Sequence, residues 1–242
     1  MNLILMETRE VTASGEATLA DGRATHLLQV LKVTPGQEIR VGLLDGPLGT
    51  ATVATITESA VTLRCVFDRA TPPRPRVDML LAVPRPKVMR RLWAQLAALG
   101  VGQVILTNAE RVERDYFDTH LLTEATYRPL LIEGLQQARD TRLPRVSIHR
   151  RFKALVEDDL DALFSGGTRI VADPGATASI HTVLGTSHEE RILLAVGPEG
   201  GWNAFELRLL EDHGFHAVGM GARTLRVDTA CVALLAMVRT AT

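Results

Sequence analysis

Two glycine-containing turns near the end of the sequence carry the residue types best suited to chemistry. The first, Gly197-Pro198-Glu199-Gly200-Gly201, directly follows an apolar run at 192–196. Because glycine has no Cβ, backbone at such a turn can come close to a ligand. A helix expected from Asn203, with Asn203 and Glu206 spaced as a cap pair, adds free N–H groups and a positive helix dipole. Alone, the pentapeptide is equally consistent with a tight strand-to-helix turn.

The second turn places an arginine and a carboxylate beside a helix start. Gly219-Met220-Gly221 ends a short strand expected at 217–220, and Leu225-Arg226-Val227-Asp228-Thr229-Ala230 follows. A closing apolar helix is expected at 229–238, with Asp228 as its N-cap whether or not the turn is functional.

A third turn, Asp173-Pro174-Gly175, follows a strand expected at 169–172 and has the composition of many ordinary turns. If these strands belong to one parallel sheet, all three turns lie at the same sheet edge. Ligands of open α/β sheets bind outside the carboxyl ends of the strands. The spacing therefore predicts a small-molecule pocket, although neither the Walker pattern nor GxGxxG is present.

The elements that would position these turns alternate between strand and helix, which is typical of a parallel sheet. The apolar run at 77–83 has the character of a strand buried on both faces. Expected after it are a helix at 87–99, a strand at 103–106, a helical region at 119–139, a strand at 146–149 and a helix at 152–164. Pro129 predicts a kink or restart within the long helical region.

The first seventy residues are β-rich instead. Strands are expected at 50–57 and 61–67, and glycine turns separate the apolar runs as in a small barrel. The proline-rich stretch 68–76 has the composition of a linker. We therefore expect two domains, residues 1–72 and 73–242.

Bulk composition is that of an ordinary globular protein, with 46% hydrophobic and 23% charged residues and a net charge of −1. No apolar run approaches the roughly 20 residues of a membrane span, and the first residues lack the features of a signal peptide. Two distant cysteines favour a reducing, cytoplasmic location, and no metal-ligand spacing appears, so no metal site is predicted. Six basic residues between 74 and 91 form a candidate RNA-binding patch, or simply a solvated face.

Taken together, the motifs resemble those of the ribosomal RNA small subunit methyltransferase E family, within the SPOUT superfamily of knotted methyltransferases. The resemblance rests on residues 194–202, then Glu206, Gly214-Phe215, and Met220-Gly221 through Ala230. Similarity extends over nearly the whole chain, including His26, Lys32, Lys87 and Glu110-Arg111.

The resemblance implies a PUA-like RNA-binding β-barrel followed by a SPOUT-type α/β domain with a C-terminal trefoil knot. It further implies a cytoplasmic homodimer that binds S-adenosylmethionine and methylates N3 of a uridine in small-subunit (16S) ribosomal RNA. The implied cofactor-site residues are Asp173, Pro174, Gly175, Val196, Gly197, Pro198, Glu199, Gly200, Gly201, Met220, Gly221, Leu225, Arg226, Val227, Thr229 and Ala230. The implied RNA contacts are His26, Lys32, Arg85, Lys87, Arg90, Arg91 and Arg111.

The sequence departs from the family pattern at three places. Asp228 stands where a glutamate is usual, Arg139 lies one residue early in Gln137-Ala138-Arg139-Asp140, and Pro129 falls within a helix. The last two changes affect the RNA-facing middle of the chain more than the cofactor site.

A mechanism follows as a hypothesis. The N3 atom of neutral uracil carries a proton, so a basic group must remove it or a cation must stabilise the anion. Arg226 is the candidate for charge stabilisation, and Glu199 or Asp228 for the base. Three alternatives stay open: a related enzyme acting on another base or on a ribose 2′-hydroxyl, a non-catalytic RNA-binding protein, and a nucleotide-dependent oxidoreductase, which lacks its fingerprint.

Overall fold

The computed structural model describes residues 2–184 and 191–240, and its contacts divide the chain into two compact units. Unit 1 comprises Met1–Arg74 and Ile132–Leu143, and unit 2 comprises Pro75–Leu131 and Pro144–Thr242. The sequence predicted a first domain of residues 1–72 only, whereas unit 1 also includes the segment Ile132–Leu143. The assignment of separate roles to the two domains stays a prediction.

Unit 1 is built on a five-stranded sheet in the order β1-β3-β4-β5-β2. Its elements are β1 (Ile4–Met6), β2 (Glu16–Leu19), α1 (Gly22–Thr25), β3 (Glu38–Leu43), β4 (Leu48–Ile56) and β5 (Val61–Phe67), with a 3₁₀ turn at Thr8–Glu10 and a π-helical turn at His26–Val30. All neighbouring strands are antiparallel except β1 and β3. Alternation along β5 turns Val61, Leu63 and Cys65 into the core, as its sequence predicts.

Thr141 joins the later segment to unit 1. Its side chain is fully buried, and its hydroxyl donates to the Gly46 carbonyl at 2.6 Å. The Asp45 N–H in turn donates to the Thr141 carbonyl at 2.8 Å. These contacts connect positions almost a hundred residues apart, which no local pattern in the sequence indicates.

Unit 2 contains a six-stranded parallel sheet in the order β11-β9-β10-β6-β7-β8. Its strands are β6 (Val77–Ala82), β7 (Val101–Thr107), β8 (Arg145–His149), β9 (Thr168–Ala172), β10 (Ile192–Val196) and β11 (Phe215–Val218). Its helices are α2 (Pro86–Ala98), the start of α3 (Glu124–Ala138), α4 (Phe152–Ala154), α5 (Leu160–Leu163), α6 (Ile180–Leu184), α7 (Ala204–Asp212) and α8 (Val227–Thr240). Shorter turns lie at Arg114–Asp118, His120–Leu122 and Leu155–Asp159. The alternation of strand and helix thus correctly predicted a parallel sheet.

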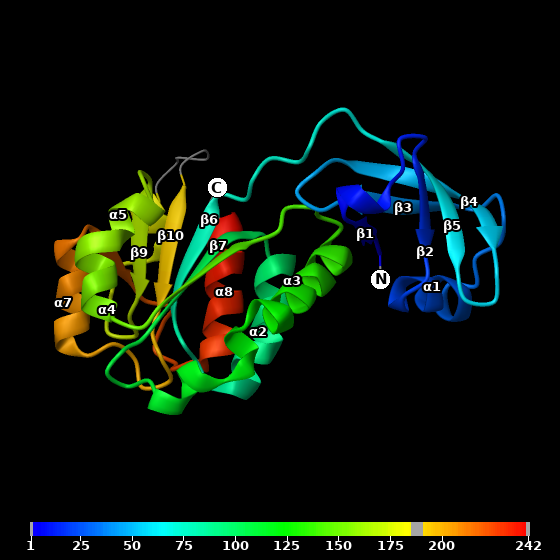
Figure 1. Ribbon diagram of the computed structural model, residues 1–242. Coiled ribbons are helices and arrows are strands. Elements are labelled where there is room, and N and C mark those ends of the chain that lie inside the picture. The colour runs from blue at the N-terminus through cyan, green and yellow to red at the C-terminus, as the bar shows by residue number, and fades with distance from the viewer. Residues whose placement is uncertain (1, 185–190, 241–242) are drawn as a thin grey trace. The chain divides into compact units, whose positions relative to one another are not determined.

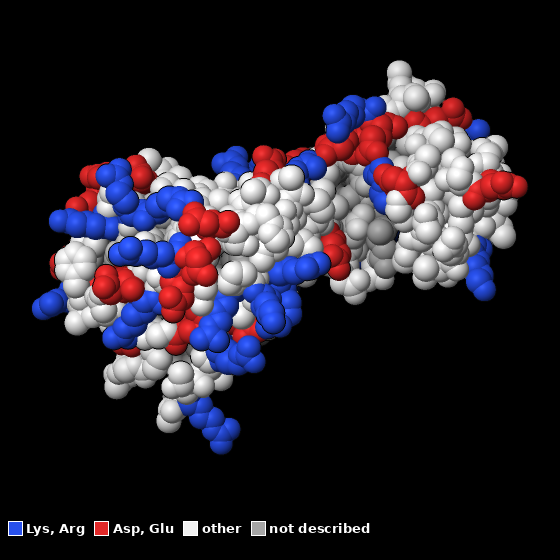
Figure 2. Space-filling view, turned by 60° about the horizontal axis from the view of Figure 1, so that its bottom comes forward, with Lys and Arg blue, Asp and Glu red and all other residues white. Residues whose placement is uncertain are grey.

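Helices cover both faces of this sheet. Helices α2 and α8 lie on one side, and α4, α5 and α7 on the other (Figure 1). Every residue of β6 and β10 is consequently buried, as expected for central parallel strands. Figure 2 brings the carboxyl ends of these strands forward and shows lysine and arginine side chains gathered there among acidic ones.

Helix α3 runs through Pro129 as one element, so the helix does not restart there, and a kink at Pro129 stays a prediction. Two other expectations about local structure are wrong. Strand β11 ends at Val218, so Gly219 and Met220 belong to the following loop. Helix α8 begins at Val227, which places Asp228 inside its first turn instead of at the N-cap.

Candidate functional site

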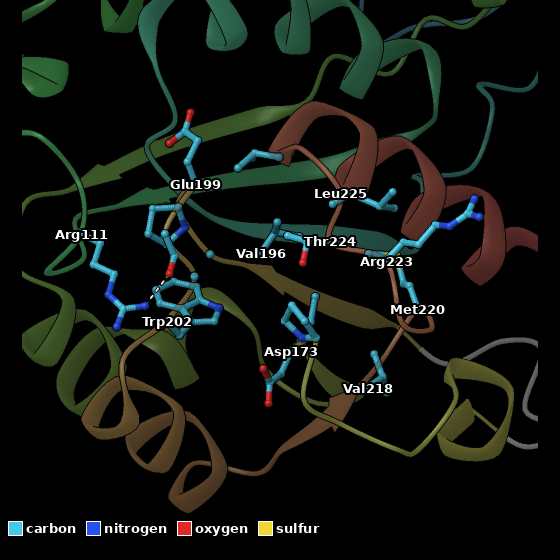
Figure 3. Close-up of a pocket in the computed structure, with 18 of the residues that line it drawn as sticks. Arg111, Asp173, Val196, Glu199, Trp202, Val218, Met220, Arg223, Thr224 and Leu225 are labelled. Carbon is cyan, nitrogen blue, oxygen red and sulfur yellow. Dashed lines mark hydrogen bonds between the residues drawn. The ribbon is translucent and has the colours of Figure 1, made fainter.

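A pocket lies where β9, β10 and β11 end, at the sheet edge that the three turns of the sequence predict. Its volume is about 310 Å³, within the range of roughly 300–1,000 Å³ that is usual for small-molecule sites. The side chains drawn in Figure 3 come from the ends of these strands, the turns after them and the loop before α8, joined by Arg111 from the loop after β7. The lining residues are Arg111, Ala172, Asp173, Pro174, Val196, Gly197, Pro198, Glu199, Gly200, Gly201, Trp202, Val218, Met220, Gly221, Arg223, Thr224, Leu225, Val227 and Ala230.

The capping of α7 fixes the glycine turn after β10. Asn203 Oδ1 accepts hydrogen bonds from the N–H groups of Phe205 and Glu206, each at 2.8 Å, and Glu206 Oε2 accepts from Asn203 N–H at 2.8 Å. The predicted cap pair is therefore confirmed as a reciprocal capping box. Glu206 is buried, and its second oxygen accepts from the Glu110 N–H at 2.7 Å. The same carboxylate thus holds the loop after β7 against the turn.

Gly197 packs closely against its neighbour Trp202. A Cβ added to Gly197 would lie 3.1 Å from Trp202 N and 3.2 Å from ring atoms Cδ1 and Nε1. Trp202 is buried, and its Nε1 has no hydrogen-bond partner among the described residues. Nearby, Arg111 Nη1 donates to the Gly200 carbonyl (Figure 3). This wall of the pocket is therefore built by close packing of backbone against two large side chains.

Asp173 organises the opposite wall. Its N–H donates to the Val218 carbonyl at 3.0 Å, and its Oδ1 accepts from Gly175 N–H at 3.1 Å. The Gly219 N–H donates to the Ala178 carbonyl at 3.0 Å, which joins the turns after β9 and β11. The Asp173 and Glu199 carboxylates point in opposite directions in Figure 3. The two carboxylates therefore do not act as a pair, and each is a single polar group in a largely apolar pocket.

Most of the residues proposed for a cofactor line this one pocket. Gly175, Arg226 and Thr229 are the proposed residues that do not. Residues not singled out for a cofactor also line it: Arg111, Ala172, Trp202, Val218, Arg223 and Thr224. Trp202 directly follows the glycine turn, and Arg223 and Thr224 lie between two segments that were predicted to bind the cofactor. Their closeness in the sequence to predicted residues could have identified these three. Nothing local indicates Arg111, which comes from a distant loop.

A second cavity of about 380 Å³ adjoins the first through the shared residues Pro198, Glu199, Thr224, Leu225 and Val227. It is completed by Arg85, Val88, Arg226 and Asp228. The structure thus places all three proposed catalytic side chains together at one cavity.

Two arginines surround the Asp228 carboxylate there. Arg91 Nη2 donates to Asp228 Oδ2 at 2.7 Å, and Arg226 Nε lies 4.0 Å from Oδ1. The hydrogen bond from Arg91 holds the pKa of Asp228 below its usual range, with the Thr229 N–H and the charge of Arg226 adding to the effect. Asp228 is consequently a weak proton acceptor. Glu199 differs, because its Oε1 accepts the backbone N–H of Arg85 at 3.0 Å and its carboxylate makes no ion pair with any residue that the structure describes.

Comparison with known proteins identifies the family. A model of an RNA methyltransferase domain matches residues 71–239. A ribosomal RNA small subunit methyltransferase E of Treponema pallidum is 32% identical over 249 residues, covering 98% of this chain and 90% of that protein. This chain belongs to the ribosomal RNA small subunit methyltransferase E family. A family protein from Borreliella burgdorferi is 24% identical and covers 96% of the chain and 95% of its own length.

Two solved structures share the fold. The ribosomal RNA small subunit methyltransferase E of Neisseria gonorrhoeae, bound to S-adenosylmethionine, has a TM-score of 0.80 at 21% identity. A putative methyltransferase of Legionella pneumophila, also with S-adenosylmethionine bound, has a TM-score of 0.80 at 19% identity. Each comparison covers 99% of this chain and 97% of the other. The fold therefore extends over both units.

The RNA contacts implied by family resemblance are dispersed in the structure. In unit 1, Lys32 is exposed with a left-handed φ of 49°, whereas His26 Nε2 is buried without a partner among the described residues and burial lowers its pKa. In unit 2, Arg85, Lys87 and Arg90 are exposed, while Arg91 and Arg111 make the contacts already given. Arg91 and Arg111 thus form hydrogen bonds with residues that line the two cavities, Asp228 and Gly200.

Within residues 2–184 and 191–240, none of the helices combines the length and apolar character needed to cross a bilayer. That part of the chain also holds no group of three or more His, Cys, Asp or Glu side chains placed to bind a metal ion.

Proposed function

We propose that this chain is an S-adenosylmethionine-dependent methyltransferase that methylates N3 of a uridine in small-subunit ribosomal RNA. The observation that carries the proposal is the pocket at the carboxyl ends of β9, β10 and β11 in a chain of this family. The N3-uridine specificity rests on the resemblance to the family alone.

The pocket suits the chemistry of the cofactor. Apolar side chains such as Val196, Met220 and Leu225 offer contacts for an adenine ring and a thioether chain. The Asp173 carboxylate can accept hydrogen bonds from ribose hydroxyls or an ammonium group. A Cβ added to Gly221 would meet no atom within 4 Å. We propose that a ligand lies against this open backbone.

When bound, the cofactor supplies an electrophilic methyl group, so the protein must chiefly align the attacking nitrogen and govern its proton. We assign charge stabilisation of the uracil anion to Arg226, whose side chain is 78% exposed at the adjoining cavity. Glu199 is the better candidate for the base, because among the described residues no arginine pairs with it, whereas Arg91 pairs with Asp228.

The wider features implied by the family are part of the same proposal. They are a PUA-like barrel in unit 1, a trefoil knot formed by the segment around α8, a homodimer, a cytoplasmic location and a ribosomal RNA partner. The mostly antiparallel sheet of unit 1 supports the first of these. Nothing in the geometry favours an oxidoreductase.

Calorimetric titration with S-adenosylmethionine, with NADH as the control ligand, tests the pocket. We expect binding of the first alone. Absence of S-adenosylmethionine binding, both for the free protein and with ribosomal RNA present, would contradict the proposal and favour a non-catalytic RNA-binding protein.

A further inference from the structure

A third cavity, of about 570 Å³, lies in unit 2 beside the proposed cofactor pocket. Four basic side chains line this cleft: Arg114, Arg150, Arg151 and Lys153. Its two carboxylates are Glu110 and Glu206, and Glu206 is buried with both oxygens engaged by backbone N–H groups. The charge that the cleft presents to a ligand is therefore positive.

Two of the four basic side chains of the cleft form ion pairs with described residues, and two do not. Arg150 pairs with Asp118 at 3.2 Å and Lys153 with Glu157 at 3.6 Å. Both pairs are exposed to solvent, and such pairs contribute little to the free energy of folding. Arg114 and Arg151 are exposed and make no ion pair with any described residue. They are thus available for anions such as phosphates.

An aromatic ring lies in the same cleft. Phe205, in the first turn of α7, is 52% exposed although phenylalanine is usually buried. Cationic side chains beside an exposed aromatic ring are the combination that binds single-stranded nucleic acid, because bases stack on the ring while phosphates meet the cations. An acidic protein surface would use the charges but has no need of the ring.

The cleft and the cofactor pocket share a wall. Phe152 lines the cleft, Trp202 lines the pocket, and their ring centroids are 5.2 Å apart. On the other side, Glu110 and Val112 line the cleft while Arg111 between them lines the pocket. A strand held in the cleft would therefore pass beside the proposed cofactor pocket.

We propose that this cleft binds single-stranded RNA adjoining the target nucleotide, with a base stacked on Phe205 and phosphates held by Arg114 and Arg151. The inference rests on the proposed action on RNA, and adds a binding surface distinct from the basic residues between 74 and 91.

Fluorescence anisotropy of a labelled oligouridylate tests the cleft, with all variants compared over a range of salt. Arg114→Ala combined with Arg151→Ala should weaken binding at least tenfold at low salt and reduce the salt slope by about 1.4, since each phosphate contact on a single strand contributes about 0.7. Phe205→Ala should weaken binding about five- to 150-fold with the slope unchanged, as loss of one stacked base predicts. Phe205→Trp should retain affinity.

Arg145→Ala is the matched control, because Arg145 is an exposed arginine at the amino end of β8, whereas Arg150 and Arg151 follow its carboxyl end. If the Arg114/Arg151 double variant behaves like Arg145→Ala, or if the unaltered protein does not bind the probe, the proposal is overturned. Unchanged oligouridylate binding with lost association to small ribosomal subunits would overturn it in favour of a protein-docking surface. Calorimetry with S-adenosylmethionine on each variant separates a failure of the cleft from a failure of the proposed function.

Discussion

Arg91 on α2 donates a hydrogen bond from Nη2 to Asp228 Oδ2 in the first turn of α8, at 2.7 Å. The pair connects two helices on the same face of the parallel sheet and neutralises one of the carboxylates proposed for catalysis. It also engages an arginine that sequence resemblance assigned to RNA.

Removal of the pair should destabilise the fold slightly and in a pH-dependent way. The side chain of Arg91 is 54% exposed, so Arg91→Ala should lower the free energy of unfolding by about 0.5 kcal/mol at neutral pH. The folded pKa of Asp228 lies below its ordinary value of 3.8. The stabilisation is therefore complete above that value and disappears as the pH falls through the lower folded pKa.

Urea unfolding across the acid range measures this effect, with Arg90→Ala as the control, since Arg90 is the exposed neighbour and makes no ion pair with the described residues. A difference between the two variants that persists at the acid end would show that Arg91 stabilises the fold by some other contact.

Arg226 should matter for turnover more than for cofactor affinity. Its side chain lies at the second cavity, outside the proposed cofactor pocket. Arg226→Ala should lower kcat by about 100-fold or more, as for other groups that stabilise developing negative charge, while Kd for S-adenosylmethionine changes little. Arg226→Lys should retain part of the activity. Equal losses of turnover and cofactor affinity would assign Arg226 to binding instead.

The two candidate bases should differ. Glu199→Gln should reduce methyl transfer by about 10²- to 10⁴-fold, because it removes the carboxylate that, within residues 2–184 and 191–240, has no arginine paired with it. Asp228→Asn keeps the shape of its side chain and should have the smaller effect, seen chiefly in stability. Rates measured over pH for both variants decide the assignment, and the reverse order of effects would make Asp228 the base.

Substitution of Gly197 tests the close packing of the turn. In Gly197→Ala the new methyl group would lie about 3.1–3.2 Å from the backbone and ring of Trp202, which forms a wall of the pocket and would have to shift to make room. We expect a loss of about 1–3 kcal/mol of stability and weaker binding of S-adenosylmethionine. Gly22→Ala is the control, since its Cβ would meet no atom within 4 Å. Equal behaviour of both variants in thermal unfolding and calorimetry would contradict this account.

Local patterns in the sequence predicted what depends on local physics. The apolar run at 192–196, the glycine turn and the Asn203–Glu206 pair predicted a buried strand, a tight turn and a capped helix, and all three are present. Because the strands before the three turns are parallel, the turns were predicted to lie at the same edge of the sheet, and they do. The prediction that Asp228 is the N-cap of the last helix was wrong, because α8 begins one residue earlier, at Val227. Side-chain type alone does not decide whether a residue caps a helix or lies in its first turn.

Long-range relationships could not be predicted in this way. Arg91 and Asp228 are 137 residues apart, and Arg111 reaches Gly200 across 89. The burial of Thr141 within unit 1 likewise depends on the tertiary fold. The cleft around Phe205 is assembled from three separate segments, each of which resembles an ordinary solvated surface in the sequence.

The most direct test of the proposed activity is transfer of an isotope-labelled methyl group from S-adenosylmethionine to small ribosomal subunits prepared from cells that lack this protein. Digestion of the RNA and separation of its nucleosides should place the label in 3-methyluridine. Label in another base or in a ribose would contradict the assigned position and indicate a related RNA methyltransferase. Cofactor binding without any transfer to RNA would contradict the proposed catalysis itself.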